Sequence, residues 1–175
     1  EIPQTVDKKL CAARLPHLKH VIKIDSEQHS GIHRFADLLI APTATQLAEL
    51  QAIAADLQFD ETINIQFTSG TTGNPKGTML THNNILNNGY FVGEAIHLTP
   101  QDRVCISVPL FHCFGMVMGN LACITHGSTM VYPSAVFNPL DTLKTIQQEK
   151  CTAAYGVPTM FIAMLEHEQF DQFDL

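Results

Sequence analysis

The sequence predicts an α/β protein built on a mainly parallel β-sheet with helices on both of its faces. Beyond Asp60, strand-like and helix-like segments alternate, an order that produces parallel strands joined by helical crossovers. Residues 104–108 are nearly all apolar, as in a strand that is covered on both sides. Asn138 and Pro139 have the residue types preferred at the N-cap and first position of a helix. We therefore expect buried strands flanked by helices.

Local periodicity gives the individual elements. Strands are expected at 21–24, 63–67, 78–80, 104–108, 129–132 and 152–155, and helices at 44–57, 82–96, 114–125, from 138 and from 157. Thr81 is the expected N-cap of the helix over 82–96. In the last helix, apolar residues recur at the spacing of a core-facing stripe: Val157, Met160, Phe161, Met164 and Leu165.

Length and charge limit the classes of function. The 175 residues fit one domain or part of one, with 1–60 as a lead-in and 61–175 as the regular α/β unit. The formal net charge of −7 and the lack of a basic run argue against nucleic acid or an anionic membrane as a main partner. The five cysteines contain no C-x-x-C pair, which argues against a disulfide framework or a zinc site and favours a reducing, cytoplasmic location.

An uncharged stretch runs from Val104 to Leu140. A membrane span is one interpretation, but a spanning helix needs about 20 predominantly apolar residues. Pro109, His112 and Pro133 interrupt the stretch before that length is reached. We expect buried core instead, and no integral membrane segment.

Residues 68–77, with the sequence TSGTTGNPKG, are the most informative part of the chain. They contain four hydroxyl side chains, three glycines and one lysine. Backbone amides in a concave turn, hydroxyl groups and a cation are the groups that hold a polyphosphate. A polar turn between two strands uses the same residue types. A Walker-type loop does not fit, because Pro75 stands where its second glycine belongs and Gly77 follows Lys76 in place of Ser or Thr. We expect a loop that joins two strands.

The stretch FTSGTTGNPKGTMLTHNN, residues 67–84, resembles the signature of the adenylate-forming (AMP-binding) superfamily, which includes acyl-CoA synthetases, luciferases and peptide-synthetase adenylation domains. Two further stretches resemble the acyl-CoA synthetases of that superfamily in order and spacing: VPLFHCFGMVMGNLACITHG at 108–127 and YGVPTMF at 155–161. The resemblance covers most of the chain and is strongest from about residue 60 onward.

The resemblance implies that the loop binds the β- and γ-phosphates of ATP. The residues concerned are Thr68, Ser69, Gly70, Thr71, Thr72, Gly73, Asn74, Pro75 and Lys76. It also implies a catalytic role for Lys76 and a contact between Thr68 and the Mg²⁺ that accompanies ATP.

The resemblance places His112 between the carboxylate and the acyl pocket, as a catalytic and substrate-binding residue beside Phe114 and Gly115. A lone histidine in an apolar segment is otherwise more often a core residue, but its place after a strand end favours function. His82 and His126 are interpreted as structural. The methionines at 116, 118 and 130 suit either core packing or an acyl channel.

The reaction implied is that of a fatty acyl-CoA synthetase. A fatty acid and ATP give an acyl-adenylate and diphosphate, and coenzyme A then displaces AMP. An amino-acid adenylating enzyme is the first alternative, but it needs a carboxylate for the substrate's ammonium group, and the stretch from Val104 to Leu140 supplies none. An aryl-acid adenylating enzyme and a non-catalytic nucleotide-binding module are the others.

The chain is expected to be an internal, inactive fragment of the large domain of such an enzyme. It lacks the family's adenine- and ribose-binding segments, its Mg²⁺-binding glutamate and its small C-terminal domain. Self-association through surfaces exposed by the missing parts is also expected.

Overall fold

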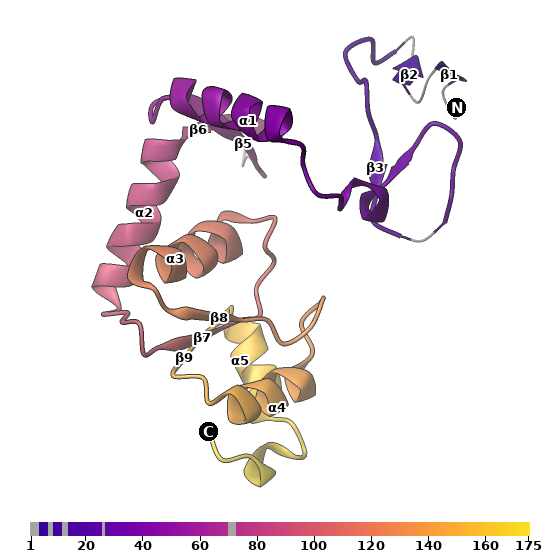
Figure 1. The fold of residues 1–175 in the computed structure, drawn as a ribbon. Coiled ribbons are helices and arrows are strands. Elements are labelled where there is room, and N and C mark those ends of the chain that lie inside the picture. The colour runs from indigo at the N-terminus through magenta and orange to yellow at the C-terminus, as the bar shows by residue number, and fades with distance from the viewer. Residues whose placement is uncertain (1–3, 7–8, 12–13, 26, 70–72) are drawn as a thin grey trace. The chain divides into compact units, whose positions relative to one another are not determined.

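The computed structural model describes residues 4–6, 9–11, 14–25, 27–69 and 73–175. The chain divides into two compact units, residues 1–57 and residues 58–175. Each unit is described by itself below, and the elements of both are labelled in Figure 1.

The first unit contains short strands and one long helix. Strands β1 (Gln4–Val6) and β2 (Lys9–Cys11) pair antiparallel, and β3 (Ile22–Lys23) pairs parallel with β4 (His33–Arg34). A 3₁₀ turn, η1 (Phe35–Leu38), precedes helix α1 (Ala44–Asp56). Thr43 and Gln46 form a capping box at the start of α1. The apolar residues that suggested this helix, Leu47, Leu50 and Ile53, are all exposed within the unit.

The second unit begins with an antiparallel hairpin. Strand β5 (Thr62–Thr68) pairs with β6 (Lys76–Thr81), with Phe67 opposite Gly77 and Thr68 opposite Lys76. This arrangement confirms the predicted strand–loop–strand. Asn64 and Gln66 point to one side of the hairpin, whereas the side chains that alternate with them are largely exposed: Ile63, Ile65 and Phe67.

Helix α2 (His82–Ala95) follows β6 directly, and the predicted N-cap Thr81 is confirmed by a capping box with Asn84. Two glycines let α2 approach its neighbours closely. A Cβ at Gly89 would lie 2.7 Å from the Leu121 Cβ, and one at Gly93 would lie 2.3 Å from the His126 ring. His126 also contacts Glu94 through Nε2 at 3.2 Å and stacks on Tyr90. Its side chain therefore occupies a notch in α2.

A three-stranded parallel sheet forms the centre of the unit. Its order is β8 (Thr129–Val131), β7 (Arg103–Ile106), β9 (Ala153–Tyr155), with Cys105 opposite both Val131 and Ala154. The central strand β7 is buried, with Val104 and Cys105 both 0 % exposed. This confirms the expectation of a strand covered on both sides.

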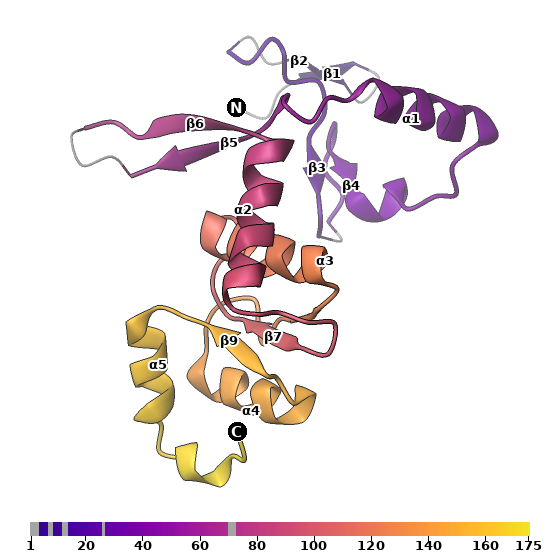
Figure 2. The same cartoon turned by 90° about the vertical axis from the view of Figure 1, so that its left-hand side faces the viewer.

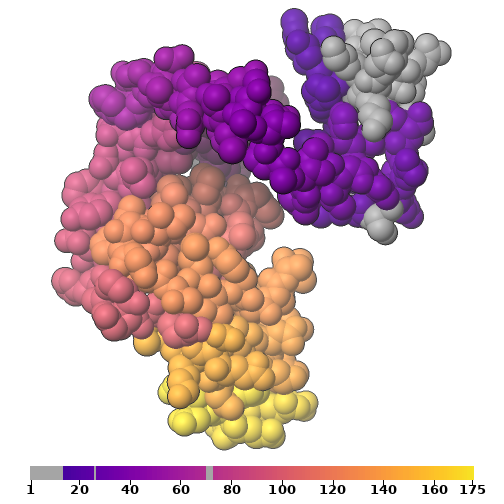
Figure 3. Space-filling model, viewed as in Figure 1, coloured from indigo at the N-terminus to yellow at the C-terminus, as the bar shows by residue number. Residues whose placement is uncertain are grey.

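Helices cover both faces of this sheet, as Figures 1 and 2 show. The π-helix η2 (Phe114–Leu121) and α3 (Ala122–His126) lie on one side, and α4 (Pro139–Glu149) and α5 (Pro158–Leu165) lie on the other. The Asn138 side chain accepts a hydrogen bond from the Asp141 amide, and Leu143 is 1 % exposed. A last 3₁₀ turn, η3 (Phe170–Gln172), follows α5. In the space-filling view the unit is a continuous packed body (Figure 3).

Three details of the sequence prediction need correction. The segment expected to be one α-helix over 114–125 begins as the π-helix η2 and becomes α-helical only at Ala122. In α5, Met164 is buried, but Phe161 and Leu165 are 38 % and 61 % exposed, because the helix covers only the edge of the sheet with one narrow face. Strand β5 pairs with β6 alone and not with the parallel strands. Among the described residues, no helix has the length and apolar character required to cross a bilayer.

Asp102 joins three segments where β7 begins. Its carboxylate accepts hydrogen bonds from the Thr99 amide at 2.8 Å, the Thr99 hydroxyl at 2.7 Å and the Thr152 hydroxyl at 2.8 Å. Hydrogen bonds from the Thr99 hydroxyl, the Thr152 hydroxyl and the Thr99 amide lower the pKa of Asp102. The stability that it contributes is therefore present above its unfolded pKa of about 3.9 and is lost as the pH falls through the lower folded pKa.

We expect Asp102→Asn to be less stable than wild type at pH 7, and the difference to close as the pH falls below about 4. Urea midpoints of both proteins at pH 7, 4 and 3 measure this. Asp60→Asn, at an exposed turn position, is the control and should show no closing gap. A difference for Asp102→Asn that is constant with pH would contradict the assignment.

Candidate functional site

The hydroxyl-rich loop lies between β5 and β6. Thr68 ends β5, and its Oγ1 donates to the Lys76 carbonyl oxygen at 3.5 Å across the base of the loop. Ser69, Gly73, Asn74, Pro75 and Lys76 are exposed, whereas Gly70, Thr71 and Thr72 lie outside the described residues. Gly73 has φ +136°, a backbone conformation that favours glycine.

The described part of this loop presents groups suited to phosphate. The Lys76 ammonium is an exposed cation, and the hydroxyls of Thr68 and Ser69 are donors close to it in the sequence. The loop connects two antiparallel strands, so no helix begins at the anion site. Charged and hydroxyl side chains therefore contribute more here than a helix dipole does.

His112 lies in the loop between β7 and η2. Its Nδ1 accepts a hydrogen bond from the Phe114 amide at 3.1 Å, and the His112 amide in turn donates to the Pro109 carbonyl at 3.3 Å. Because Nδ1 is the acceptor, the proton of the neutral imidazole sits on Nε2. His112 is exposed, so this Nε2–H group is a donor that a carboxylate can reach.

Gln66 connects the hairpin to the His112 loop. Its Nε2 donates to the Phe111 carbonyl oxygen at 3.1 Å, across 45 positions of sequence. Gln66 stands two residues before Thr68, and Phe111 precedes His112. The two predicted site regions are thus joined by a hydrogen bond, although β5 does not belong to the parallel sheet. Sequence reasoning missed Gln66, because it occupies an ordinary polar position of an alternating strand.

Phe114 and Gly115 fasten the start of η2 to the ends of β7 and β9. The Phe114 ring meets the Tyr155 ring edge-on, with centroids 5.4 Å apart. Gly115 is buried, and a Cβ there would lie 2.5 Å from the Pro109 carbonyl oxygen. The Ser107 hydroxyl donates to the Tyr155 carbonyl at 2.7 Å. The loops that follow β7 and β9 are therefore neighbours, as the sequence predicted for these two.

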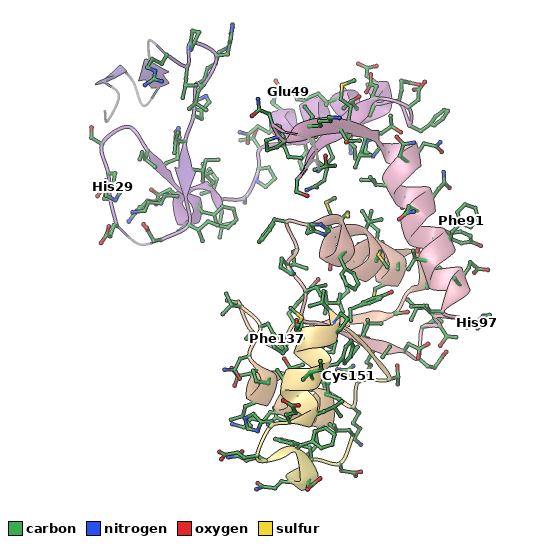
Figure 4. The ribbon with its side chains drawn as sticks, turned by 180° about the vertical axis from the view of Figure 1, so that it is seen from behind. His29, Glu49, Phe91, His97, Phe137 and Cys151 are labelled. Atoms are coloured by element: carbon green, nitrogen blue, oxygen red, sulfur yellow. The ribbon has the colours of Figure 1, made fainter. Side chains whose placement is uncertain are left out.

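A cavity of about 790 Å³ opens at the carboxyl ends of β7 and β8. It is lined by residues 106–111, Tyr132, residues 134–137 and Met160. Figure 4 shows Phe137 on the loop that follows β8. All of the lining except Met160 comes from the uncharged stretch 104–140, and no lining residue carries a charge. Such a cavity suits an apolar ligand better than a zwitterion.

The cysteines differ in their surroundings. Burial raises the pKa of Cys105 to about 12 and that of Cys123 to about 11, so both thiols stay protonated and unreactive. Cys113 is exposed, which corrects the expectation that it is buried, and its sulfur lies 3.6 Å from the His112 Nδ1. The described residues contain no group of three or more His, Cys, Asp or Glu side chains that could hold a metal ion.

The parallel sheet with helices on both faces is that of the N-terminal domain of adenylate-forming enzymes. An anthranilate CoA ligase, AuaEII, in complex with anthranoyl-AMP superimposes with a TM-score of 0.75 at 26% identity, over 92% of this chain and 30% of that one. ATP-bound MatB from Rhodopseudomonas palustris gives a TM-score of 0.59 at 28% identity, over 65% of this chain and 22% of that one.

The chain belongs to the AMP-binding enzyme family, whose model matches residues 3–175. The putative acyl-CoA synthetase YngI of Bacillus subtilis is 48% identical over 100% of this chain and 32% of its own length. The mitochondrial medium-chain acyl-CoA ligase ACSF2 of Danio rerio is 44% identical over 94% of this chain and 27% of its length. This chain therefore spans about a third or less of the curated relatives that it matches. The predicted superfamily is confirmed.

Proposed function

We propose that the protein of which this chain is a part is an acyl-CoA synthetase that activates fatty acids. The carboxylate attacks the α-phosphorus of ATP, which forms the acyl-adenylate and releases diphosphate. The thiol of coenzyme A then attacks the acyl carbon, forms the thioester and releases AMP. The observation that carries the proposal is the loop with Thr68, Ser69 and Lys76, joined through Gln66 to the loop that bears His112.

In this proposal the chain is a segment of the AMP-binding domain, with residues 1–60 leading into the α/β unit of 61–175. The greater length of the relatives supports it. Exposed apolar side chains also support it: Phe67, Met79 and Phe91 are each 66–68% exposed, and Phe91 stands out from α2 in Figure 4. We expect the isolated chain to be inactive and to self-associate through such side chains. Free thiols favour a cytoplasmic location.

The hairpin loop is assigned to ATP. Residues 68–76 would surround the β- and γ-phosphates with amide and hydroxyl donors, and the Lys76 ammonium would neutralise charge on the departing diphosphate. The Thr68 hydroxyl oxygen is a hard ligand of the kind that Mg²⁺ accepts beside phosphate oxygens. Bound Mg²⁺ would supply charge neutralisation between those oxygens.

The His112 loop is assigned to the acid. The His112 Nε2–H would donate to the carboxylate and hold it in line for attack. The cavity beyond β7 and β8 would receive the alkyl chain, because its lining is uncharged and mostly apolar. An amino acid fits less well, because no described residue of the lining balances an ammonium group.

We expect the full-length enzyme to activate octanoate or palmitate in preference to any α-amino acid. Acid-dependent exchange of labelled diphosphate into ATP, measured across a panel of acids, tests this. Benzoate and anthranilate in the panel examine the aryl-acid alternative. Faster exchange with an amino acid or an aryl acid would reverse the proposed ranking.

The isolated 175-residue chain is the matched control in the same experiment. We expect it to form no thioester with palmitate and coenzyme A, and to bind Mg²⁺–ATP only weakly, because phosphate contacts alone leave the binding energy of adenine and ribose unused. Micromolar binding in a calorimetric titration, together with thioester formation, would contradict the assignment of this chain as an incomplete site.

A further inference from the structure

The three tyrosines of the chain differ in how their hydroxyl groups are satisfied. Tyr90 is 43 % exposed on α2, where water reaches it. The Tyr132 hydroxyl donates to the Asn120 Oδ1 at 3.0 Å. The Tyr155 hydroxyl oxygen is buried and has no hydrogen-bond partner among the described residues. Tyr155 is thus the tyrosine whose polar group lacks both water and a protein partner in this structure.

Tyr155 lies beside the proposed acid site. It ends β9, at the carboxyl edge of the sheet, and pairs with Ile106 of β7. Ile106 packs beneath Gly119 of η2, so the Tyr155 side chain is on the η2 face of the sheet. There its ring meets the edge of Phe114, whose amide holds His112 through Nδ1. One side chain therefore separates the Tyr155 ring from the residue assigned to the carboxylate.

A buried hydroxyl without a partner destabilises a protein, and phenylalanine would fill the same space without that cost. The ring packs against a core of apolar residues such as Val104, Ile106 and Val108, which offer no side-chain acceptor. Burial raises the pKa of Tyr155, so the phenol stays protonated and acts as a donor. A tyrosine at this position is explained if a ligand supplies the acceptor.

We propose that the Tyr155 hydroxyl donates a hydrogen bond to an oxygen carried on the chain of the acid, a hydroxyl, ether or carbonyl group, and that the enzyme prefers such oxygenated acids to the unsubstituted acid of equal length. This inference rests on the proposed function and specifies its substrate class. Phe114 is only half-buried and contacts the Tyr155 ring, so rotation of its side chain would open a path to the hydroxyl.

The test compares octanoate with its hydroxy- and oxo-substituted derivatives, varied in position, as substrates of the full-length enzyme. We expect at least one derivative to exceed octanoate by about 10-fold or more in kcat/KM, since a site that bonds a polar group discriminates against the analogue that lacks it. In Tyr155→Phe that ratio should fall to about 1, mainly through loss on the oxygenated acid. Tyr90→Phe is the control and should keep the wild-type ratio.

Thermal unfolding of the ligand-free proteins gives an independent readout. Tyr155→Phe should match or exceed the wild-type Tm, because it removes an unpaired buried hydroxyl. Tyr132→Phe should lower the Tm, because it leaves the Asn120 oxygen without its donor. A merely structural Tyr155 would show the pattern of Tyr132.

Three outcomes would overturn the inference. The wild type could prefer no oxygenated acid, Tyr155→Phe could retain the preference, or Tyr155→Phe could lower the Tm of the full-length protein as Tyr132→Phe does. The last result would mean that another part of the protein already bonds the hydroxyl. Failure of the proposed function looks different, because no acid of the panel would then give a thioester.

Discussion

Replacing Lys76 by methionine in the full-length protein should lower the rate of adenylate formation by about 100-fold or more, in line with the loss of one charge-stabilising donor. The Lys76 side chain is exposed at the first position of β6, beside the loop assigned to the phosphates. Methionine retains most of the length of the side chain and removes its charge. The effect should therefore appear in the chemical step and not in folding.

Diphosphate exchange and thermal unfolding together measure both quantities. The Tm of Lys76→Met should stay near that of wild type, because an exposed side chain contributes little packing. Lys144→Met, at an exposed position of α4, is the matched control and should leave the exchange rate unchanged. The double change Thr71→Ala, Thr72→Ala should also reduce exchange about 100-fold. Wild-type exchange in both loop variants would refute the assignment of the loop to ATP.

Much of the fold could be predicted because the relevant signals are local. Thr81 and Asn138 are helix N-caps in the structure as expected, since capping depends on residues within one turn. The apolar run that became β7 indicated burial on both faces, and Val104 and Cys105 are indeed fully buried. The phosphate motif is contiguous, so its residue types and spacing identified the family without any knowledge of tertiary contacts.

Other features depend on contacts that no local pattern encodes. The bond from Gln66 to the Phe111 carbonyl joins residues 45 positions apart, and a backbone acceptor leaves no trace in the sequence. The π-helical start of η2 also escaped prediction, because the residue types of π- and α-helices overlap. The outward Phe161 and Leu165 of α5 show that helical periodicity reports an apolar face but not what covers it.

These non-local features meet at Gly115. It is the second residue of η2, it follows His112 by three positions, and it is buried against the turn that closes the His112 loop. An added Cβ would lie 2.5 Å from the Pro109 carbonyl oxygen, 2.9 Å from the Pro109 carbonyl carbon and 3.0 Å from the Val108 carbonyl oxygen. All three are backbone atoms, which cannot turn aside as a side chain can. A larger residue must therefore move the loop or the start of the helix.

Gly115→Ala should accordingly affect both stability and activity. Overpacking of a buried site costs about 1–3 kcal/mol of unfolding free energy. The shift of the loop also displaces His112, and a misplacement of about 1 Å in a group that orients substrate can cost about 100-fold in rate. We expect adenylate formation in the full-length enzyme to fall by about 10-fold or more at temperatures well below the Tm of the variant.

Gly119→Ala is the matched control, one turn further along the same helix. Its added Cβ would meet only the Ile106 side chain, at 3.0 Å, which can move without disturbing the His112 loop. It should lose some stability but keep nearly the wild-type rate of diphosphate exchange. The comparison separates a general loss of packing from displacement of the acid-binding loop. Equal exchange rates in the two variants, measured where both are folded, would mean that the close contact between Gly115 and Pro109 does not position His112.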